Sequence, residues 1–483
     1  MVEMDRRSVL RGAVAGALLG GPFAGFVTRA AADPAPAHEL GPIEDLRDGK
    51  VRLWLPRDFQ YRSFHDTESA VTLTDGTRLP GRHDGMGAFH AAGGNYLLVR
   101  NHEINNAGPA FGDATKAYDP MAQGGTTTVE VTPFGEVVRS YTSLNGTQMN
   151  CSGGRMPWNS WVSCEETVNG PDIGPDFTGA PNIALTQRHG FVFDVPADGE
   201  SDRQPITAAG RFAHESVAYD PKGGYLYLTE DDFGFPSGFY RYKPRRDPIR
   251  TGRLDNDGRL QMLRVKGVAN ANLAAAQAPG TSYKVDWVDI EDPAPSFPYT
   301  PGVPAPTAND MALTHVARQG WAQGAAYFSR LEGSAYDNEI VYFTSTQGGG
   351  PAETSIGPIA DGYGNGSGQI WAYHTRAEKL RLLFESPGPD VLDFPDNVTT
   401  SKRGTLVVCE DNVNDNYIRG LTPGGQLFDI ALNRLVGANG LPRFNDEFAG
   451  STFSPDGHTL FVNIQASRGL TFAIWGPWHK IGV

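Results

Sequence analysis

The sequence of 483 residues contains only three cysteines, Cys151, Cys164 and Cys409. Three are too few for the disulfide framework of a small secreted domain, and an odd number leaves at least one thiol unpaired. The sequence leaves open whether Cys164 and Cys409 pair. A chain of this length can instead be stabilised by a large hydrophobic core.

Several familiar signatures are also missing in a convincing context: the dinucleotide and phosphate-loop glycine patterns, the HExxH zinc motif and the GxSxG nucleophile motif. Positive charge is scarce, because 41 Lys and Arg residues face 55 Asp and Glu residues, a net charge of -14. This balance argues against nucleic acid or an anionic membrane as the main partner. An anionic substrate would need bound cations, which reverse the local sign of the field.

Long stretches with helical periodicity are rare, whereas glycine (59) and proline (35) are frequent. This combination favours many short strands joined by turns. The aromatic content is typical of a folded protein.

The N-terminus predicts a targeting segment over residues 1–32. Arg6 and Arg7 precede a short, weakly apolar run rich in Gly and Ala, followed by Ala30-Ala31-Ala32. This pattern is typical of a twin-arginine signal, and an uncleaved membrane anchor fits less well because the run is short and interrupted. We expect the chain to use the twin-arginine export machinery, which carries folded and often cofactor-loaded proteins, and to reach the periplasm or the extracellular space without a stable membrane anchor.

A divergent repeat organises residues 33–483. Each of six copies has a segment with a polar residue in an apolar or glycine-rich setting, a turn, and a β-rich strand, most of which end in acidic or amide residues. The first segments start near Asp84, Asn150, Phe212, Ser329, Phe394 and Asp446. Six such copies predict an all-β six-bladed β-propeller. A β-sandwich and two smaller β domains are the alternatives.

Residues 244–304 interrupt the repeat and predict an insertion between the third and fourth blades. The segment is rich in Asp, Pro, Ala and Gly and includes a helix-like piece at 269–276. It could form a lid or a rim element.

In a propeller, the first segment of each copy lines a central channel. This predicts six side chains around one axis: Asp84, Cys151, Glu215, Glu332, Asp396 and Glu447. Converging carboxylates repel one another unless cations bind between them. Oxygen ligands suit Ca²⁺, Mg²⁺, Mn²⁺ or Fe³⁺, whereas one thiolate, at Cys151, favours a transition metal for at least one position.

Other residues near these motifs have different expected roles. Arg330 lies two positions before Glu332, which would put both side chains on one face of a strand, where the cation could bind an anionic substrate group. Cys164 and Cys409 occupy equivalent strand ends and are expected to be buried packing residues. His102 and His214 are expected to be structural or to support the metal ligands.

Four groups of residues resemble the PhoX-type alkaline phosphatases: 150–158 with 164–166, 210–216, 330–333, and 395–397 with 409–412. The resemblance extends over nearly the whole mature chain, and its most specific parts are Cys151-Ser152-Gly153-Gly154 and Arg330-Leu331-Glu332-Gly333. It implies hydrolysis of phosphomonoesters outside the cytoplasm by a cluster of Fe³⁺ and Ca²⁺ ions in a six-bladed propeller.

The resemblance also implies roles for individual residues. Arg330 would bind the phosphate group, and Cys151 would bind iron. The implied cluster ligands are Cys151, Glu166, Glu215 and Glu332, and further candidates, for calcium above all, are Asn101, Glu103, Glu230, Asp231, Asp396, Glu410 and Asp411.

The competing interpretation is a calcium-binding propeller that acts as a binding module, an esterase or a lactonase. Such proteins also line their channel with Asp, Asn and Glu. Cys151 together with Arg330 favours the phosphatase, because a calcium lactonase has no evident use for a thiolate ligand and an arginine. We expect a monomer in either case.

Overall fold

The computed structural model describes residues 38–483, so the predicted signal segment lies outside the described residues. The described chain is mostly β, which confirms the predicted class at that level, and all paired strands run antiparallel. Its few helices are short: η1 (Ala92–Gly94), η2 (Thr207–Ala209), α3 (Pro248–Thr251), α4 (Asn309–Leu313), α5 (His315–Ala322) and η3 (Trp478–Ile481).

The strands form successive antiparallel units along the chain. The first sheet contains β4 (His83–His90), β5 (Tyr96–His102), β6 (Gly124–Val131) and β7 (Val137–Thr147). The second contains β8 (Asn150–Met156), β9 (Ser160–Glu165) and β10 (Val192–Pro196). In both sheets the first strand of the unit is an edge strand and is largely buried.

A nine-stranded sheet combines the third and fourth units. The third contributes β11 (His214–Asp220), β12 (Tyr225–Glu230), β13 (Phe239–Pro244), β14 (Gly258–Val265) and β15 (Ser282–Asp289). The fourth contributes β16 (Leu331–Asp337), β17 (Ile340–Ser345), β18 (Gln369–His374) and β19 (Lys379–Glu385). The two units meet where β15 pairs with β19.

The last two units recruit the N-terminal strands. The fifth contains β20 (Pro395–Thr400), β21 (Leu406–Glu410), β22 (Tyr417–Leu421) and β23 (Leu427–Asn433), extended by β2 (Val51–Pro56) and β1 (Leu40–Glu44). The sixth contains β24 (Glu447–Phe453), β25 (Thr459–Gln465) and β26 (Leu470–Trp475), completed by β3 (Gln60–Phe64).

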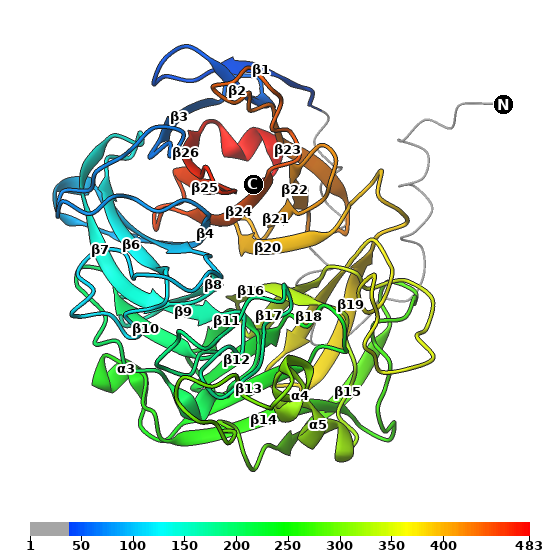
Figure 1. Ribbon diagram of the computed structural model, residues 1–483. Coiled ribbons are helices and arrows are strands. Elements are labelled where there is room, and N and C mark those ends of the chain that lie inside the picture. The colour runs from blue at the N-terminus through cyan, green and yellow to red at the C-terminus, as the bar shows by residue number, and fades with distance from the viewer. Residues whose placement is uncertain (1–37) are drawn as a thin grey trace.

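The first strands of the six units lie next to one another in a closed ring. In the order β4, β8, β11, β16, β20 and β24, each strand contacts the next, and β24 contacts β4. Figure 1 shows these strands around the centre of the molecule, with the later strands of each unit outside them. The start of every unit therefore faces a common centre.

Residues 244–304 form α3, β14 and β15, which extend the third unit outward. The predicted helix-like piece at 269–276 is wrong, because this segment contains a turn and a bend but no helix, and Asn272 and Ala275 form bridges to Tyr327 and Gly350. The Asn272 side chain accepts a hydrogen bond from the Ala274 N–H at 3.1 Å, a local contact that competes with helix. Helices α4 and α5 follow the segment instead.

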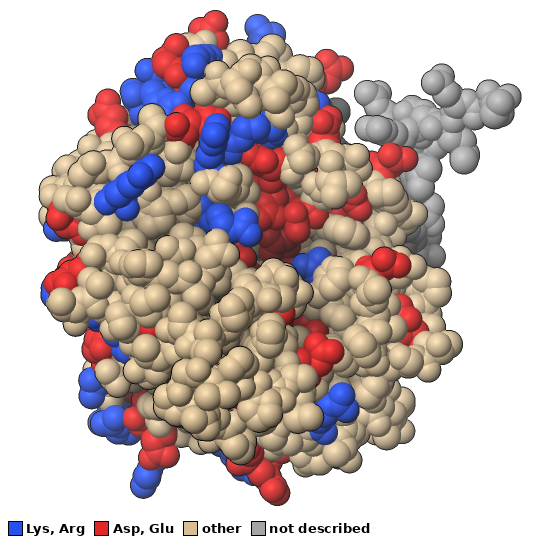
Figure 2. Space-filling view, viewed as in Figure 1, with Lys and Arg blue, Asp and Glu red and all other residues tan. Residues whose placement is uncertain are grey.

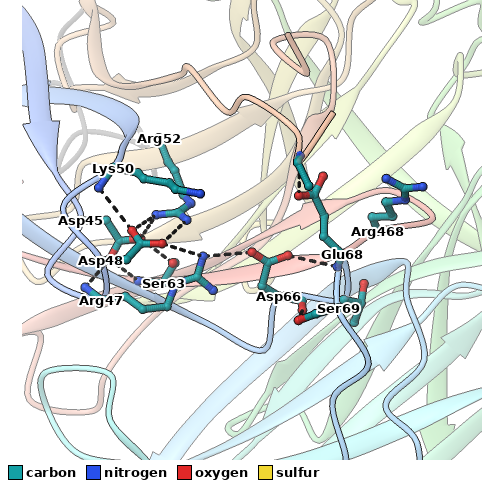
Figure 3. Close-up of polar contacts among 12 residues, drawn as sticks. Asp45, Arg47, Asp48, Lys50, Arg52, Ser63, Asp66, Glu68, Ser69 and Arg468 are labelled. Carbon is teal, nitrogen blue, oxygen red and sulfur yellow. Dashed lines mark hydrogen bonds and ion pairs between the residues drawn. The ribbon is translucent and has the colours of Figure 1, made fainter. Parts of the chain in front are cut away.

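A network of charged side chains anchors the N-terminal strands (Figure 3). Arg52 on β2 lies 2.7 Å from Asp45 and 2.7 Å from Asp48, and Arg47 lies 2.9 Å from Asp66, just after β3. The Arg52–Asp45 pair is buried, so losing one partner would leave an uncompensated charge. The network joins the strand pair β1–β2 of the fifth unit to β3 of the sixth.

The hydrophobic core lies between neighbouring units. Cys164 packs in a cluster shared by the second and third units, and Cys409 in one shared by the fifth and sixth. Both side chains are fully buried, as predicted for packing residues. All three cysteines are unpaired, which answers the question about Cys164 and Cys409.

Candidate metal centre

The same irregularity recurs near the start of five inner strands. Two residues of the first strand lie opposite one residue of the second, which is a β-bulge. The first residue of each bulge is Asp84, Cys151, Glu215, Glu332 or Asp396. A bulge re-aims a side chain, so these five residues have equivalent places around the centre.

The sixth unit departs from this pattern. Its bulge comes at Gly450 and Ser451, three residues after Glu447. Glu447 is instead the first residue of β24, yet its pKa is raised by burial and by the charges of Asp411, Asp396 and Asp84. Glu447 therefore lies near the same group of carboxylates although it is not part of a bulge.

Glycines at two bulges allow the inner strands to approach closely. A Cβ atom on Gly85 would lie 2.5 Å from Cα of Ser152, and one on Gly333 would lie 2.6 Å from the backbone nitrogen of Val398. Both distances are shorter than non-bonded contacts permit. The glycine that follows Asp84 and Glu332 is therefore required by packing between neighbouring units.

A second tier of acids comes from the residue directly after the second strand of four units. These residues are Glu103, Glu166, Asp231 and Asp411. Their charges act on the pKa values of the bulge carboxylates, which places them at the same centre. Figure 2 shows acidic side chains gathered in a hollow at the middle of the molecule.

The last residue of the strand itself points elsewhere, because side chains alternate along a strand. Glu230 accepts hydrogen bonds from the Gly238 N–H at 2.7 Å and the Tyr240 hydroxyl at 2.9 Å. Glu410 accepts from the backbone of Asp393 and from Arg419. The structure thus does not bring these two predicted ligands into the central group but uses them to hold loops.

The side chain of Asn101, a further candidate ligand from the sequence, makes hydrogen bonds to the backbone of the next unit. Its Nδ2 donates to the backbone carbonyls of Cys151 at 3.1 Å and of Ser152 at 2.7 Å. Thr229 of the third unit makes the equivalent bond: its hydroxyl donates to the backbone carbonyl of Glu332 in the fourth unit at 2.6 Å. Asn101 therefore fixes the backbone that carries Cys151, and its side chain is fully used: Oδ1 accepts from Trp161 and Ser163.

Two sets of potential ligand atoms converge at the centre. One oxygen or sulfur atom each of Cys151, Glu166 and Glu215 lie within 4.8 Å of one another, and so do oxygens of Glu215, Glu332 and Asp396. The first set combines a thiol with carboxylates and suits a transition metal, whereas the second offers oxygen alone and suits a hard cation. Glu215 belongs to both sets.

The electrostatics of these groups show why cations fit there. Burial and then the charges of Glu166, Asp396 and Asp84 raise the pKa of Glu215 well above its usual value. Burial and neighbouring acids likewise raise the pKa of Asp396 to about 7. Bound cations would relieve this repulsion.

The Cys151 thiol also has a raised pKa. Burial, followed by the charges of Glu215 and Glu166, raises its pKa well above the usual value. A thiolate at this position therefore requires a positive partner, which a metal ion would provide.

Arg330 lies at the edge of the group. Its Nη2 is 2.9 Å from Asp231 and 2.8 Å from Glu332, and the Phe233 ring lies 5.5 Å from its guanidinium carbon. The sequence placed Arg330 inside the strand, but it precedes β16 with a φ of 36°. This left-handed residue, rather than strand alternation, brings its side chain beside Glu332.

Sequence reasoning missed two features. One is Arg82, which begins Arg82-His83-Asp84-Gly85 in the first unit just as Arg330 begins Arg330-Leu331-Glu332-Gly333 in the fourth. Aligning the copies two residues further upstream would have revealed it.

The other is a fully buried triad behind Glu166. His189 Nδ1 lies 2.6 Å from Glu165, and Nε2 lies 3.5 Å from Asp119. Although burial opposes it, these two carboxylates raise the pKa of His189 to about 9. Nothing in the local sequence links these three residues, because the fold brings them together.

The raised carboxyl pKa values predict how the metal-free protein responds to pH. Burial raises the pKa of Glu103 and of Asp396 to about 7 in the folded state, whereas unfolded carboxyls titrate near 4. The folded state then holds these protons more tightly, so their stabilising contribution is complete below pH ~4 and is lost as the pH rises through about 7. We expect the melting temperature of metal-stripped protein to fall by on the order of 5 °C between pH 5 and pH 8.

Differential scanning calorimetry of stripped and metal-loaded protein measures this effect. The loaded protein should show a much smaller decrease, because cations keep the carboxylates ionised. A stripped protein that becomes more stable over this pH range would contradict the raised pKa values of these buried carboxyls.

Comparison with known proteins identifies the family. The family model described as "Alkaline phosphatase PhoX" matches residues 38–467. No curated protein matched the chain. Among solved structures, Pseudomonas fluorescens PhoX in complex with vanadate, a transition state analogue, aligns with a TM-score of 0.65 and 16% identity over 92% of this chain and 98% of that chain.

Two other solved structures align less well. Virginiamycin B lyase from Staphylococcus aureus gives a TM-score of 0.34 at 12% identity, over 86% of this chain and 99% of that chain. A gluconolactonase from Xanthomonas campestris gives 0.36 at 12% identity, over 85% and 100%. These two TM-scores are too low to support any inference about this chain. The family model matches most of the described residues, so the chain belongs to the PhoX alkaline phosphatase family and is a phosphomonoesterase.

Proposed function

We propose that this phosphatase is an exported enzyme that hydrolyses phosphomonoesters at a mixed Fe³⁺ and Ca²⁺ cluster in the channel of a six-bladed β-propeller. The proposal rests above all on Glu215, which joins a thiol-containing ligand set to a set of oxygens alone. Membership of the PhoX family supports metal dependence. Iron is assigned to the side of Cys151, and calcium to the oxygen-rich side.

The closed ring of six inner strands supports the propeller, with residues 244–304 as an insertion that widens the third blade. In this arrangement every blade contributes a side chain to the channel from the start of its first strand. Each copy of the sequence repeat then corresponds to one blade of the ring.

Export is proposed from Arg6-Arg7 and the weakly apolar segment after them. The destination would be the periplasm or the extracellular space. Among residues 38–483, no helix is long and apolar enough to cross a membrane.

Residues of the chain would bind and orient the substrate. Arg330 is held in place by Asp231 and Glu332 through Nε and Nη2, and the two N–H groups of its Nη1 can donate to oxygens of a phosphomonoester dianion. The side chain of Arg330 is only 15% exposed, so water screens this interaction weakly. Bound metal ions would supply Lewis acidity that neutralises phosphoryl charge and activates water.

The decisive experiment measures metal content and activity together. Purified protein should contain iron and calcium by elemental analysis, be coloured through the Cys151 thiolate, and hydrolyse p-nitrophenyl phosphate. Calcium chelation should abolish the activity. Colourless protein without metal and without phosphatase activity would refute the proposal.

A matched pair of cysteine variants assigns the iron ligand. Cys151→Ala should bleach the protein and abolish hydrolysis, whereas Cys409→Ala, which removes a buried thiol from a hydrophobic cluster, should keep both colour and metal. Colour and activity retained in Cys151→Ala would exclude Cys151 as the ligand.

A further inference from the structure

A second arginine occupies the place equivalent to Arg330 on the other side of the ring. Arg82 directly precedes β4 with a φ of 46°, as Arg330 precedes β16 with a φ of 36°. Counting round the ring of inner strands, β4 and β16 are three strands apart in either direction. The two arginines therefore approach the same centre from opposite units.

Arg82 faces the acidic group but is only loosely held. Its Nε donates to the backbone carbonyl of Glu103 at 2.8 Å and lies 3.4 Å from the Glu103 carboxylate. The positive charge of Arg82 counteracts the raised pKa values of Glu103 and Asp84, which shows that the guanidinium lies near both. Its position is thus at the edge of the proposed metal centre.

Arg82 also has hydrogen-bond donors to spare. Within residues 38–483, no partner hydrogen-bonds to its Nη1 or Nη2. Its side chain is 42% exposed, against 15% for Arg330. Arg330 uses two carboxylates to fix its orientation, whereas Arg82 leaves one edge of its guanidinium fork facing solvent.

Arg82 touches the buried Glu103 carboxylate through Nε alone, at 3.4 Å, so this contact leaves the Nη1–Nη2 edge of the guanidinium unused. A planar guanidinium with a free edge is suited to bind a phosphate or a carboxylate with two parallel hydrogen bonds. Because the transferred phosphate would lie at Arg330 and the metals, an anion at Arg82 would be a different group of the same molecule.

We propose that Arg82 binds a second anionic group of the substrate, so that the enzyme favours phosphomonoesters that carry another phosphate or a carboxylate. This inference rests on the proposed function of the centre. Arg82 would set specificity without taking part in the transfer itself.

The test compares two esters that differ by one phosphate, fructose 6-phosphate and fructose 1,6-bisphosphate. The measured quantity is the ratio of kcat/KM for the bisphosphate to kcat/KM for the monophosphate, from initial rates of phosphate release. Arg82→Ala should lower this ratio about 10-fold, since one charge-assisted contact is lost. Arg78→Ala is the matched control, because Arg78 is an exposed arginine four residues away and should keep the wild-type ratio.

The outcomes distinguish a role of Arg82 in specificity from a role in supporting the centre. An equal loss on both esters would show that Arg82 only supports the centre, and an unchanged ratio would show that it binds no second group; either overturns the inference. If Arg82→Ala does not fold, Arg82→Gln replaces it, with the same fall expected. Wild-type protein inactive on both esters would contradict the proposed function instead.

Discussion

Glu215→Gln should abolish phosphatase activity and empty the whole centre of metal. Glu215 is the one residue common to both ligand sets, so the neutral amide weakens both positions at once. We expect the loss in kcat/KM for p-nitrophenyl phosphate to reach about 10³-fold or more, since the metals supply most of the stabilisation of the phosphoryl charge. Elemental analysis should show that iron and calcium fall together.

Three matched variants make this result specific. Glu166→Gln should lower the iron content first and Asp396→Asn the calcium content first, because each belongs to one set only. Glu230→Gln changes an equally buried carboxyl in the same unit whose bonds go to Gly238 and Tyr240. It should cost about 1–2 kcal/mol of stability without loss of metal. If Glu230→Gln empties the centre while Glu215→Gln does not, the assignment of the two ligand sets is wrong.

Arg330→Ala should leave the metals bound but lower kcat/KM about 10²–10³-fold. The guanidinium is the one cation that lies within hydrogen-bond distance of both Asp231 and Glu332 among the described residues. Removing it makes the centre more negative, which favours cations and disfavours a phosphate dianion. Inorganic phosphate should accordingly inhibit the variant much less than the wild-type enzyme.

Arg330→Lys and Arg264→Ala complete the comparison. Lysine keeps the charge but not the planar fork, so part of the activity should return. Arg264 on β14 forms a partly exposed ion pair with Asp286 on β15, and its loss should have no effect on activity. Normal phosphate inhibition in Arg330→Ala would show that this arginine does not bind the substrate.

The sequence predicts the inner residues well for a physical reason. Asp84, Cys151, Glu215, Glu332 and Asp396 recur at one step of a repeat, and the fold converts equal places in the repeat into equal places around a ring. The strand ends also lie where the repeat predicts them. Glu447 follows the repeat less closely, since its unit carries the bulge three residues later.

What the sequence could not resolve is which of two adjacent acids faces the centre. Glu165 and Glu166 look alike in the chain, as do Glu230 and Asp231, and only the alternation at the end of the strand separates a loop anchor from a central carboxylate. The sequence also does not indicate the positive φ angles of Arg82 and Arg330, because no residue type other than glycine identifies a left-handed position. Long-range contacts such as His189 with Asp119 exist only in the folded chain.

The pairing of β3 with β26 has a consequence for how the protein folds. The side chains of Gln60 and Trp475, hydrogen-bonded across this pair, are 415 positions apart in the chain. Contacts of such high sequence separation carry a large entropic cost before they form, and proteins dominated by them fold slowly. The sixth unit is therefore completed late, because β3 finds its partner only after β26 has left the ribosome.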